Sequence, residues 1–255
     1  MPETVFIVDV GNTSTTVALG RAGRIINIHR MPTVETSAKS VRSLVKYVLG
    51  SHRATGSIVS SVVPKVDKTW RSLLEAAIGS RPLMVNHRLK LSVAIDYPHP
   101  ETVGGDRLAN ACGAVDRYGA PVIVADFGTA LTFDVISKDC VYIGGVIAPG
   151  LPLMTDYLAE RTALLPEIKL KGSHGKIGKS TVEAMRIGAR LGYRGIVKEL
   201  ANHLLSLPGM RNATVCATGG FARWVLDDID MPIRFSLDLT LYGLHVIYKM
   251  NMGTQ

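Results

Sequence analysis

The chain has 255 residues, of which 47% are hydrophobic and 20% charged, as in ordinary soluble globular proteins. No apolar run approaches the roughly 18 residues of a membrane span, and the N-terminus lacks the basic leader of a signal peptide. Three widely spaced cysteines show no metal-ligand pairing, which favours free thiols in a reducing compartment. We therefore expect a cytoplasmic protein with no membrane partner.

The net charge of +8 is compatible with an anionic partner: a nucleic acid, a membrane surface or a phosphorylated small molecule. Part of the excess lies between residues 160 and 200, which hold nine Lys or Arg against four acidic residues. Four of these cations recur every four residues and form one stripe on a helix, namely Arg186, Arg190, Arg194 and Lys198. The stripe lacks interleaved aromatic residues and a nucleic-acid motif, so we interpret it as a solvated face and expect no nucleic-acid partner.

The first elements in chain order form a strand, a tight turn and a second strand over residues 5–19. An apolar run ends in Asp9, Gly11 and four hydroxyl-bearing residues before the chain turns apolar again. The same order recurs over residues 122–135. Aligning Asp9 with Asp126, 117 residues later, also aligns Gly11 with Gly128. The repeat predicts two related halves.

The rest of the first half alternates strands and helices. We predict a strand at 24–30, a helix at 41–49, a strand at 57–63, a helix at 68–78 and a strand at 83–85. This order is typical of an α/β fold in which the later strands are parallel.

The second half repeats the pattern and begins near residues 118–121. After its hairpin we predict a strand at 141–150, a helix near 153–162, a long helix at 181–205, a strand at 213–218 and a closing helix at 239–250. In the long helix, Gly188, Gly192 and Gly195 each cost about 1 kcal/mol relative to Ala. We interpret them as a packing face that meets another subunit or domain.

Both hairpins have the chemistry of a phosphate and cation site. A carboxylate cannot hold a phosphate directly, but a cation between them removes the repulsion while backbone N–H groups and hydroxyls bind the phosphate oxygens. Ordinary turns also favour Asp and Gly. The second copy favours the phosphate and metal interpretation.

A Gly-Gly turn precedes Asp106 and Arg107 at a predicted helix start, where a base would lie beside a cation. The spacing is equally compatible with a helix N-cap and a surface ion pair. Gly219 and Gly220 follow a strand directly, so they allow either a close ligand or a tight turn.

Seven segments in order resemble the type III pantothenate kinase family over nearly the whole chain. They are Asp9-Val10-Gly11-Asn12-Thr13, Ser60-Ser61-Val62-Val63-Pro64, Gly104-Gly105-Asp106-Arg107, Asp126-Phe127-Gly128-Thr129-Ala130, Gly144-Gly145-Val146-Ile147-Ala148-Pro149-Gly150, Ile177-Gly178-Lys179-Ser180-Thr181 and Ala217-Thr218-Gly219-Gly220.

The resemblance implies duplicated ribonuclease H-like α/β domains of the acetate and sugar kinase, Hsp70 and actin superfamily, with an interdomain cleft. The two actin-like ATPase subdomains would span residues 1–118 and 119–255. The implied activity is ATP-dependent phosphorylation of pantothenate, the first step of coenzyme A biosynthesis. It implies a homodimer with a shared active site that uses Mg²⁺ and a monovalent cation, K⁺ or NH₄⁺.

The resemblance also implies a role for each matching residue. Asp106 is the expected catalytic base, Asp126 the ligand of the monovalent cation, and Thr129 an ATP contact. The remaining ATP-phosphate contacts come from the first turn: Asp9, Val10, Gly11, Asn12, Thr13, Ser14, Thr15 and Thr16. Pantothenate would be held by Tyr97, Gly104, Gly105, Asp106, Arg107 and, across the dimer, Thr181.

Three positions depart from the family pattern: His99, Gly105 and Tyr242, where the family usually has Asn, Ala and Glu. None of the departures removes a residue with a chemical role, so they bear on substrate affinity. Two alternatives remain. A kinase of the same superfamily acting on a sugar or acetate would share both hairpins, and a non-catalytic nucleotide-binding regulator would use the basic stripe.

Overall fold

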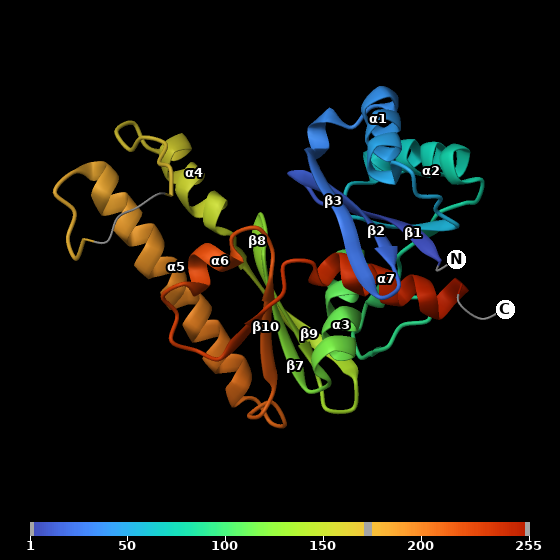
Figure 1. Ribbon diagram of the computed structural model, residues 1–255. Coiled ribbons are helices and arrows are strands. Elements are labelled where there is room, and N and C mark those ends of the chain that lie inside the picture. The colour runs from blue at the N-terminus through green and yellow to red at the C-terminus, as the bar shows by residue number, and fades with distance from the viewer. Residues whose placement is uncertain (1–2, 171–174, 253–255) are drawn as a thin grey trace. The chain divides into compact units, whose positions relative to one another are not determined.

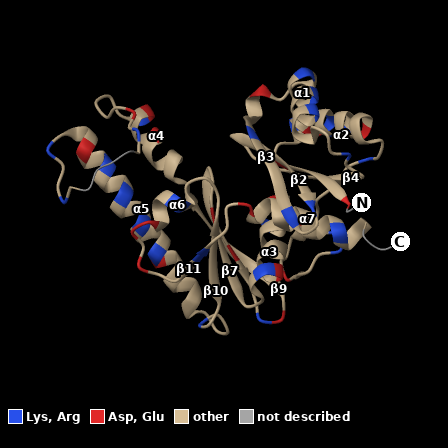
Figure 2. Ribbon diagram, viewed as in Figure 1, with Lys and Arg blue, Asp and Glu red and all other residues tan. Residues whose placement is uncertain are grey.

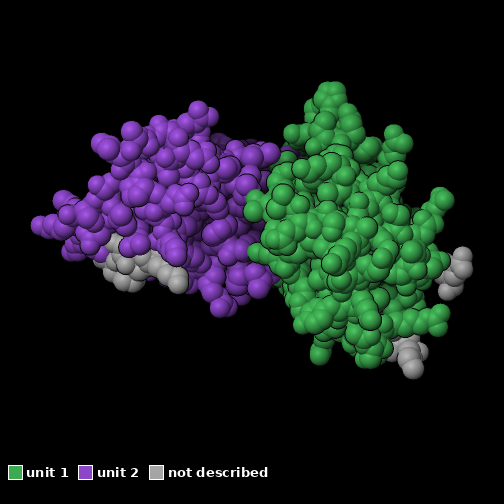
Figure 3. Space-filling model, turned by 90° about the horizontal axis from the view of Figure 1, so that it is seen from above, with its two compact units in different colours: residues 1–119, 139–143, 238–255 green, residues 120–138, 144–237 purple. Residues whose placement is uncertain are grey.

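The computed structural model describes residues 3–170 and 175–252 (Figure 1). Two compact units divide the chain, as Figure 3 shows in different colours. Unit 1 takes in the described residues up to 119, residues 139–143 and the described residues from 238 on, and unit 2 takes in the described residues of 120–138 and 144–237. Within the described ranges, no helix combines the length and the apolar character that crossing a membrane requires.

Unit 1 is built on a five-stranded sheet with the order β3-β2-β1-β4-β5. β1 and β2 form an antiparallel hairpin, whereas β4 and β5 run parallel to β1, as the sequence predicts. The strands are β1 (Thr4–Val10), β2 (Ser14–Arg21), β3 (Arg24–Pro32), β4 (Gly56–Ser61) and β5 (Leu83–Met84).

Helices α1 (Ala38–Leu49) and α2 (Pro64–Ile78) cover one face of this sheet. Alternate residues of β1 point to them, so that Phe6 and Val8 share one hydrophobic core with Trp70 of α2. α1 begins three residues before the predicted start, because Ser37 and Ser40 form a reciprocal capping box. α2 begins four residues early, since Pro64, three residues after the end of β4, is the first residue of the helix.

The opposite face of the sheet is covered by α7 (Leu239–Met252), which packs against α3 (Gly105–Tyr118). Gly113 of α3 and Gly243 of α7 bring the two backbones together. A Cβ atom at Gly243 would overlap the carbonyl oxygen of Ala109, and one at Gly113 would lie 2.9 Å from the carbonyl oxygen of Leu239. Glycine at both positions is therefore what permits this helix pair.

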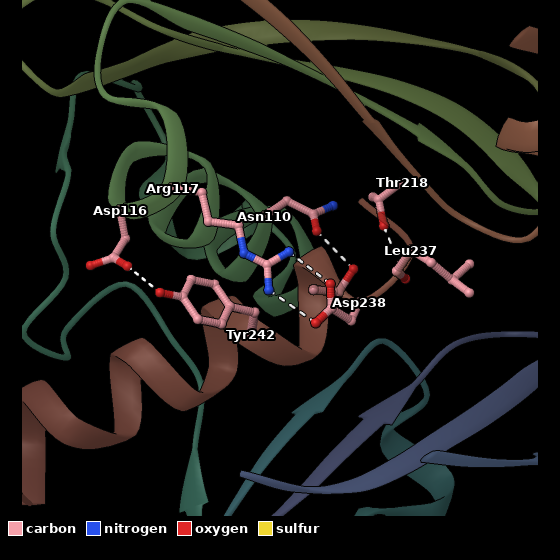
Figure 4. Close-up of polar contacts among 8 residues, drawn as sticks. Asn110, Asp116, Arg117, Thr218, Leu237, Asp238 and Tyr242 are labelled. Carbon is pink, nitrogen blue, oxygen red and sulfur yellow. Dashed lines mark hydrogen bonds and ion pairs between the residues drawn. The ribbon is translucent and has the colours of Figure 1, made fainter. Parts of the chain in front are cut away.

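Polar contacts add to the α3–α7 packing (Figure 4). Arg117 donates two hydrogen bonds to Asp238, at 2.7 and 2.9 Å, and its guanidinium lies 3.9 Å from the ring centroid of Tyr242. The Tyr242 hydroxyl in turn donates to Asp116. Tyr242 is one of the three positions that depart from the pattern of the family that the sequence resembles. Here it completes a contact between the two helices.

Unit 2 holds most of a six-stranded sheet with the order β11-β10-β7-β8-β9-β6. Its second hairpin, β7 and β8, is antiparallel, while β10 runs parallel to β7 and to β11. The short β6 belongs to unit 1 and pairs with the part of β9 in that unit. The strands are β6 (Ala94–Ile95), β7 (Val122–Phe127), β8 (Ala130–Ile136), β9 (Val141–Pro149), β10 (Thr214–Thr218) and β11 (Ile233–Phe235).

The core of unit 2 lies between this sheet and the long helix α5 (Thr181–Ser206). Tyr193 and Val197 of α5 are fully buried against Phe127 and Phe133 of the hairpin. α4 (Leu151–Arg161) begins two residues before its predicted start, and the short α6 (Ala222–Leu226) and β11 have no counterpart in the predicted elements.

The two compact units differ from a single cut of the chain at residue 118. The closing helix α7 comes from the second half of the sequence but packs within unit 1. We retain 1–118 and 119–255 as a proposal about the duplicated halves, whereas the compact units describe the packing.

The α3–α7 contact predicts that Gly243→Ala destabilises unit 1 strongly. The added methyl overlaps backbone that cannot rotate away, so the free energy of unfolding should fall by about 3 kcal/mol or more, measured by urea denaturation. Thr240→Ala is the matched control on the same helix. It removes a 2.8 Å hydrogen bond to Asn110 and should cost only about 1 kcal/mol. Equal losses in the two variants would contradict the steric explanation.

Candidate functional site

The turn of the first hairpin lies at the carboxyl end of β1. Asp9 is half-buried and pairs in register with Thr16 of β2 and, on the parallel side, with Ser60 of β4. The N–H of Gly11 donates to the Ser14 carbonyl at 3.1 Å, which closes the turn. Exposed at its tip are Asn12 and Thr13. The turn therefore presents exposed amide and hydroxyl side chains beside a carboxylate.

A residue absent from the sequence prediction, Thr33, supports this turn. Its hydroxyl donates to the Gly11 carbonyl at 2.7 Å, its N–H donates to the Thr13 carbonyl at 3.0 Å, and it lies 2.9 Å from the Thr15 hydroxyl. Both threonine side chains are buried, so Thr15 faces the interior of the fold. Thr33 is far from the hairpin in sequence, and no local pattern marked it.

The start of α3 lies at the same edge of the unit 1 sheet. A Cβ atom at Gly105 would be 3.1 Å from the Ser60 hydroxyl oxygen, so the first turn of α3 contacts the end of β4. Since Ser60 pairs with Asp9, the predicted base and the predicted phosphate turn belong to neighbouring parts of one unit. This contact also bears on Gly105, where the pattern of the family that the sequence resembles has Ala. A methyl fits there only if Ser60 or Val85 shifts slightly.

Asp106 occupies the first turn of α3 and is half-buried. Its carboxylate accepts the N–H of Arg107 at 2.9 Å. Burial raises the pKa of Asp106 above its ordinary value, and the hydrogen bond and positive charge of Arg107 offset part of the rise. A Cβ atom at Gly104 would overlap the Asp106 carboxylate, so glycine is needed for this orientation. The arrangement is that of a carboxylate tuned toward proton uptake.

An aromatic cluster surrounds Arg107. The guanidinium lies 5.8 Å from the ring centroid of the fully buried Tyr142, and the Tyr97 ring meets Tyr142 edge-on at 6.3 Å. All three residues belong to unit 1. The structure thus brings Tyr97 and Arg107 together, as expected of one substrate pocket, through a tyrosine that sequence reasoning missed because it lies on the short β9–β6 pairing.

The second hairpin has the same local design in unit 2. Asp126 is half-buried at the end of β7, in register with Thr132 of β8 and Thr218 of β10. Gly219, at a φ of 94°, packs directly on it: a Cβ atom there would lie 2.6 Å from the Asp126 carboxylate and from the Phe127 backbone. Gly219 is therefore required for close backbone packing on the carboxylate turn, whereas a ligand contact of the Gly-Gly pair stays a prediction.

The Thr129 backbone is held by a second glycine. The Gly150 N–H donates to the Thr129 carbonyl at 3.1 Å, and any side chain at Gly150 would overlap that carbonyl. On α5, burial raises the pKa of Tyr193 to about 12, with a contribution from the negative charge of Asp126. Tyr193 therefore stays neutral beside this carboxylate at physiological pH.

Thr181 is the first residue of α5, in unit 2, and is exposed. Ser180 caps the helix by accepting the Glu183 N–H at 3.3 Å, while the Glu183 side chain accepts the Lys179 N–H at 2.7 Å. These contacts define where the helix begins and leave the Thr181 side chain at the surface of the unit. The sequence prediction places Thr181 at the substrate, and that assignment stays a prediction.

The basic stripe of α5 is only partly a solvated face, because Lys198 is exposed whereas Arg190 and Arg194 pack within unit 2. Arg194 is buried, donates to the carbonyls of Trp224 and Val225 at 3.0 and 2.9 Å, and pairs with Asp228. Arg190 lies 4.0 Å from the same carboxylate, with only 16% of its side chain exposed. These cations pack α5 against α6 and the residues after it. The interpretation of the stripe as a solvated face was wrong for Arg190 and Arg194, because periodicity does not show which face of a helix is covered.

Among the residues that the structure describes, no three His, Cys, Asp or Glu side chains cluster as a metal site. Asp126 supplies one half-buried carboxylate, in a turn rich in backbone carbonyls and hydroxyls. Oxygen donors of this kind suit hard cations. The residues therefore fit a cation that shares its coordination with a bound phosphate, and they do not form an all-protein cage.

Solved structures share this fold. A protein from Campylobacter jejuni described as a Baf family transcriptional activator aligns with a TM-score of 0.62 at 16% identity, over 98% of this chain and 100% of that one. MreB5 of Spiroplasma citri bound to AMPPNP aligns with a TM-score of 0.51 at 12% identity, over 97% and 96%. The fold is that of the acetate and sugar kinase, Hsp70 and actin superfamily, as the sequence predicts.

The sequence relatives identify the family, whereas the solved structures show the fold. The family model of type III pantothenate kinase matches residues 5–203. The type III pantothenate kinase of Akkermansia muciniphila is 41% identical over 98% of this chain and 100% of its own length, and that of Thermomicrobium roseum is 36% identical over 96% of each. The chain belongs to the type III pantothenate kinase family.

The support that Thr33 gives to the first turn can be measured with a double-mutant cycle. Thr33→Val removes two hydroxyl contacts and leaves the buried Thr15 hydroxyl without its partner, so unfolding free energy should fall by about 2 kcal/mol. Thr15→Val in the same chain removes the stranded hydroxyl, and the double variant should recover part of the loss. Strictly additive losses in urea denaturation would show that the two hydroxyls do not interact.

Proposed function

We propose that this chain transfers the terminal phosphoryl group of ATP to the hydroxyl of pantothenate, the first step of coenzyme A biosynthesis. Membership of the family supports the reaction. The observation that carries it at the level of residues is Asp106: a half-buried carboxylate with a raised pKa, oriented by Arg107 at the start of α3.

Phosphoryl transfer requires little covalent chemistry from the protein. Phosphoryl transfer passes through a loose transition state, so positioning and charge neutralisation supply most of the acceleration. Asp106 accepts the proton of the substrate hydroxyl as the bond to phosphorus forms. Its raised pKa brings its basicity closer to that task than an exposed aspartate would be.

Pantothenate binding is assigned to the residues around Asp106. Arg107 binds the substrate carboxylate or the transferring group, and the Tyr142 face limits where the guanidinium can lie. Tyr97, 38% exposed, lines the pocket over the same aromatic cluster. Gly104 and Gly105 would contact the substrate through their backbone, since the space beside their Cα atoms is taken by the Asp106 carboxylate and by Ser60 and Val85.

ATP is assigned to the two aspartate hairpins. In the first, Asn12, Thr13, Ser14 and Thr16 offer side chains to the phosphates, whereas the buried Val10 and Thr15 contribute through the backbone. Gly11 permits the turn, and Asp9 faces Mg²⁺ carried by the nucleotide. When bound, the divalent cation neutralises charge on the phosphates.

The second hairpin supplies the monovalent cation site. Asp126 ligates K⁺ or NH₄⁺ there, and Thr129 contacts ATP. The close packing of Gly219 and Gly150 fixes the carboxylate and the Thr129 carbonyl in position. A monovalent cation in this turn offsets negative charge beside the nucleotide.

The active unit is proposed to be a homodimer. Three glycines of α5, Gly188, Gly192 and Gly195, are exposed, and a Cβ atom at any of them would meet nothing within 4 Å in this chain. Beside them, Leu191 leaves 54% of its surface exposed. Such a face lets a second α5 approach closely, and Thr181 at the start of the helix then reaches the pantothenate of the partner.

A non-catalytic regulator is not favoured. That alternative depended on the basic stripe of α5, and Arg190 and Arg194 are used in packing within unit 2. A kinase for a sugar or acetate would share both hairpins but gives no reason for the cluster of Asp106, Arg107 and Tyr142.

The test is a coupled assay of ADP formation with pantothenate, glucose, glycerol and acetate as acceptors, in K⁺ and in Na⁺. We expect turnover with pantothenate alone and a higher rate in K⁺. Turnover with a different acceptor, or none with pantothenate, would overturn the proposed function, while equal rates in the two salts would overturn only the cation assignment.

Asp106→Asn should lower kcat by about 10²- to 10⁴-fold, because the variant cannot accept the proton. Glu101→Gln, an exposed carboxylate five residues earlier, is the matched control and should keep the wild-type rate. A near-wild-type kcat for Asp106→Asn would contradict its role as the base.

The pH dependence of kcat/KM and that of the free energy of unfolding separate the role of Asp106 in catalysis from its effect on stability. The folded state raises the Asp106 pKa, so it binds more protons than the unfolded state, and unfolding free energy falls as pH rises through that window. Asp106→Asn removes this loss of unfolding free energy, so the variant should unfold at the same or a higher urea concentration than the wild type at pH 7. The acid limb of kcat/KM should lie above pH 3.8, the ordinary value of the group.

The glycine face of α5 predicts the oligomeric state. Gly192→Glu places a carboxylate from each copy at the proposed interface, so mass measurement by light scattering should change from dimer to monomer, with loss of activity. Ala77→Glu, which adds the same charge at an exposed position of α2, should leave the dimer intact. A dimeric Gly192→Glu variant would place the interface elsewhere.

A further inference from the structure

The positive charge of the chain is concentrated in one short part of unit 1. Residues 20–72 contain ten Lys or Arg and two acidic residues, Glu35 and Asp67, an excess of eight that equals the net charge of the whole protein. The ten cations are Arg21, Arg24, Arg30, Lys39, Arg42, Lys46, Arg53, Lys65, Lys68 and Arg71. Within this segment, the residues that support the proposed kinase site are Thr33 and Ser60, and none of the ten cations is assigned a role there.

Three of these cations share one face of α1. Lys39, Arg42 and Lys46 are exposed and follow at intervals of three and four residues, opposite the buried Val41 and Val45. α1 contains no acidic residue. Figure 2 shows the blue segments along this helix and along neighbouring α2.

A second set of cations lies on α2. Lys65, Lys68 and Arg71 are exposed, again opposite the buried face of the helix. Across the described part of the chain, none of the six cations of α1 and α2 takes part in an ion pair. Like charges three and four residues apart repel one another and destabilise both helices. These unpaired cations therefore leave their charge available to an anionic partner.

An aromatic ring lies beside the α1 cations. Tyr47 follows Lys46 directly, is 68% exposed, and is held edge-on by the His29 ring of β3 at a centroid distance of 4.7 Å. Arg30 follows His29 on the same edge strand and lies 3.4 Å from the Thr16 hydroxyl. We call Lys39, Arg42, Lys46 and Tyr47 the α1 basic face. It combines unpaired cations with a fixed aromatic ring.

We propose that the α1 basic face binds single-stranded nucleic acid. Lys39 and Lys46 are about 10 Å apart along the helix axis, a length that spans roughly three phosphates of one strand. The cations contact the phosphates, and an unpaired base stacks on Tyr47, which is how sequence-tolerant single-strand binders combine charge and aromatic rings. This function goes beyond pantothenate phosphorylation and does not depend on it.

A membrane surface fits the same observations less well. A helix that binds membranes inserts its apolar face among the lipids, but the apolar face of α1 is buried in the core through Val41, Val45 and Val48. Ser43, exposed between Arg42 and Lys46, adds a hydroxyl of the kind that binds phosphate oxygens.

The test measures the fluorescence anisotropy of labelled 20-nucleotide single strands of mixed sequence, as DNA and as RNA, between 50 and 200 mM salt. The full chain should bind, with affinity that falls linearly with salt on logarithmic axes. The variant Lys39→Ala/Arg42→Ala/Lys46→Ala should lower the slope by about 2, because three phosphate contacts of about 0.7 each are lost. Its pantothenate kinase activity should be unchanged, which shows that it folds.

The matched control removes the same charge elsewhere. Lys138→Ala/Lys169→Ala/Arg211→Ala changes three exposed residues of the second half and should bind as the wild type does. Tyr47→Ala should weaken single-strand binding about tenfold and duplex binding little. A preference of the wild-type protein for DNA or for RNA would show which of the two nucleic acids is its partner.

Four results would overturn the proposal: no binding at 50 mM salt, equal losses in the two triple variants, duplex binding as tight as single-strand binding and insensitive to Tyr47, or binding to vesicles with 30% phosphatidylserine in place of the oligonucleotides. The second result would show adsorption by net charge alone, and the last would assign the face to membranes.

Discussion

The close contact between α3 and α7 is the constraint on which unit 1 depends. Gly113 and Gly243 let the two backbones meet, and the pair of Arg117 with Asp238 holds them at one end. The contact fixes α3 against the helix that covers the sheet, and α3 carries Asp106 in its first turn. A methyl at Gly113 or Gly243 would shift α3, the helix that carries Asp106. Phosphoryl transfer relies on positioning, so it depends on two glycines that lie away from the reacting groups.

Glycine has a related role beside Asp106 and at the second aspartate hairpin. Gly104 leaves the space that the Asp106 carboxylate occupies, while Gly219 and Gly150 pack on the turn of Asp126 and Thr129. In each case a side chain would displace a carboxylate or a backbone carbonyl. Close backbone contacts therefore help to hold these polar groups in place.

The two basic regions of the chain differ in what surrounds them. On α5, the Asp228 carboxylate and two carbonyls neutralise or bind the guanidinium of Arg194, so its charge contributes to packing. On α1, Lys39, Arg42 and Lys46 extend from a helix without acidic residues. Periodicity is similar in both helices, and only the covering elements separate a packing role from a binding role.

The sequence by itself indicated the family and its superfamily fold through seven segments that resemble the family in order. It also located both aspartate hairpins, because alternating apolar residues and turn chemistry are local signals. It missed Thr33 and Tyr142, and it misjudged the α5 stripe. Those depend on contacts between residues far apart in the chain, such as Thr33 with Gly11 and Arg194 with Asp228. Tertiary structure decided which polar groups are buried, which cations are paired, and that α7 packs in unit 1, since burial and pairing arise only when distant segments meet.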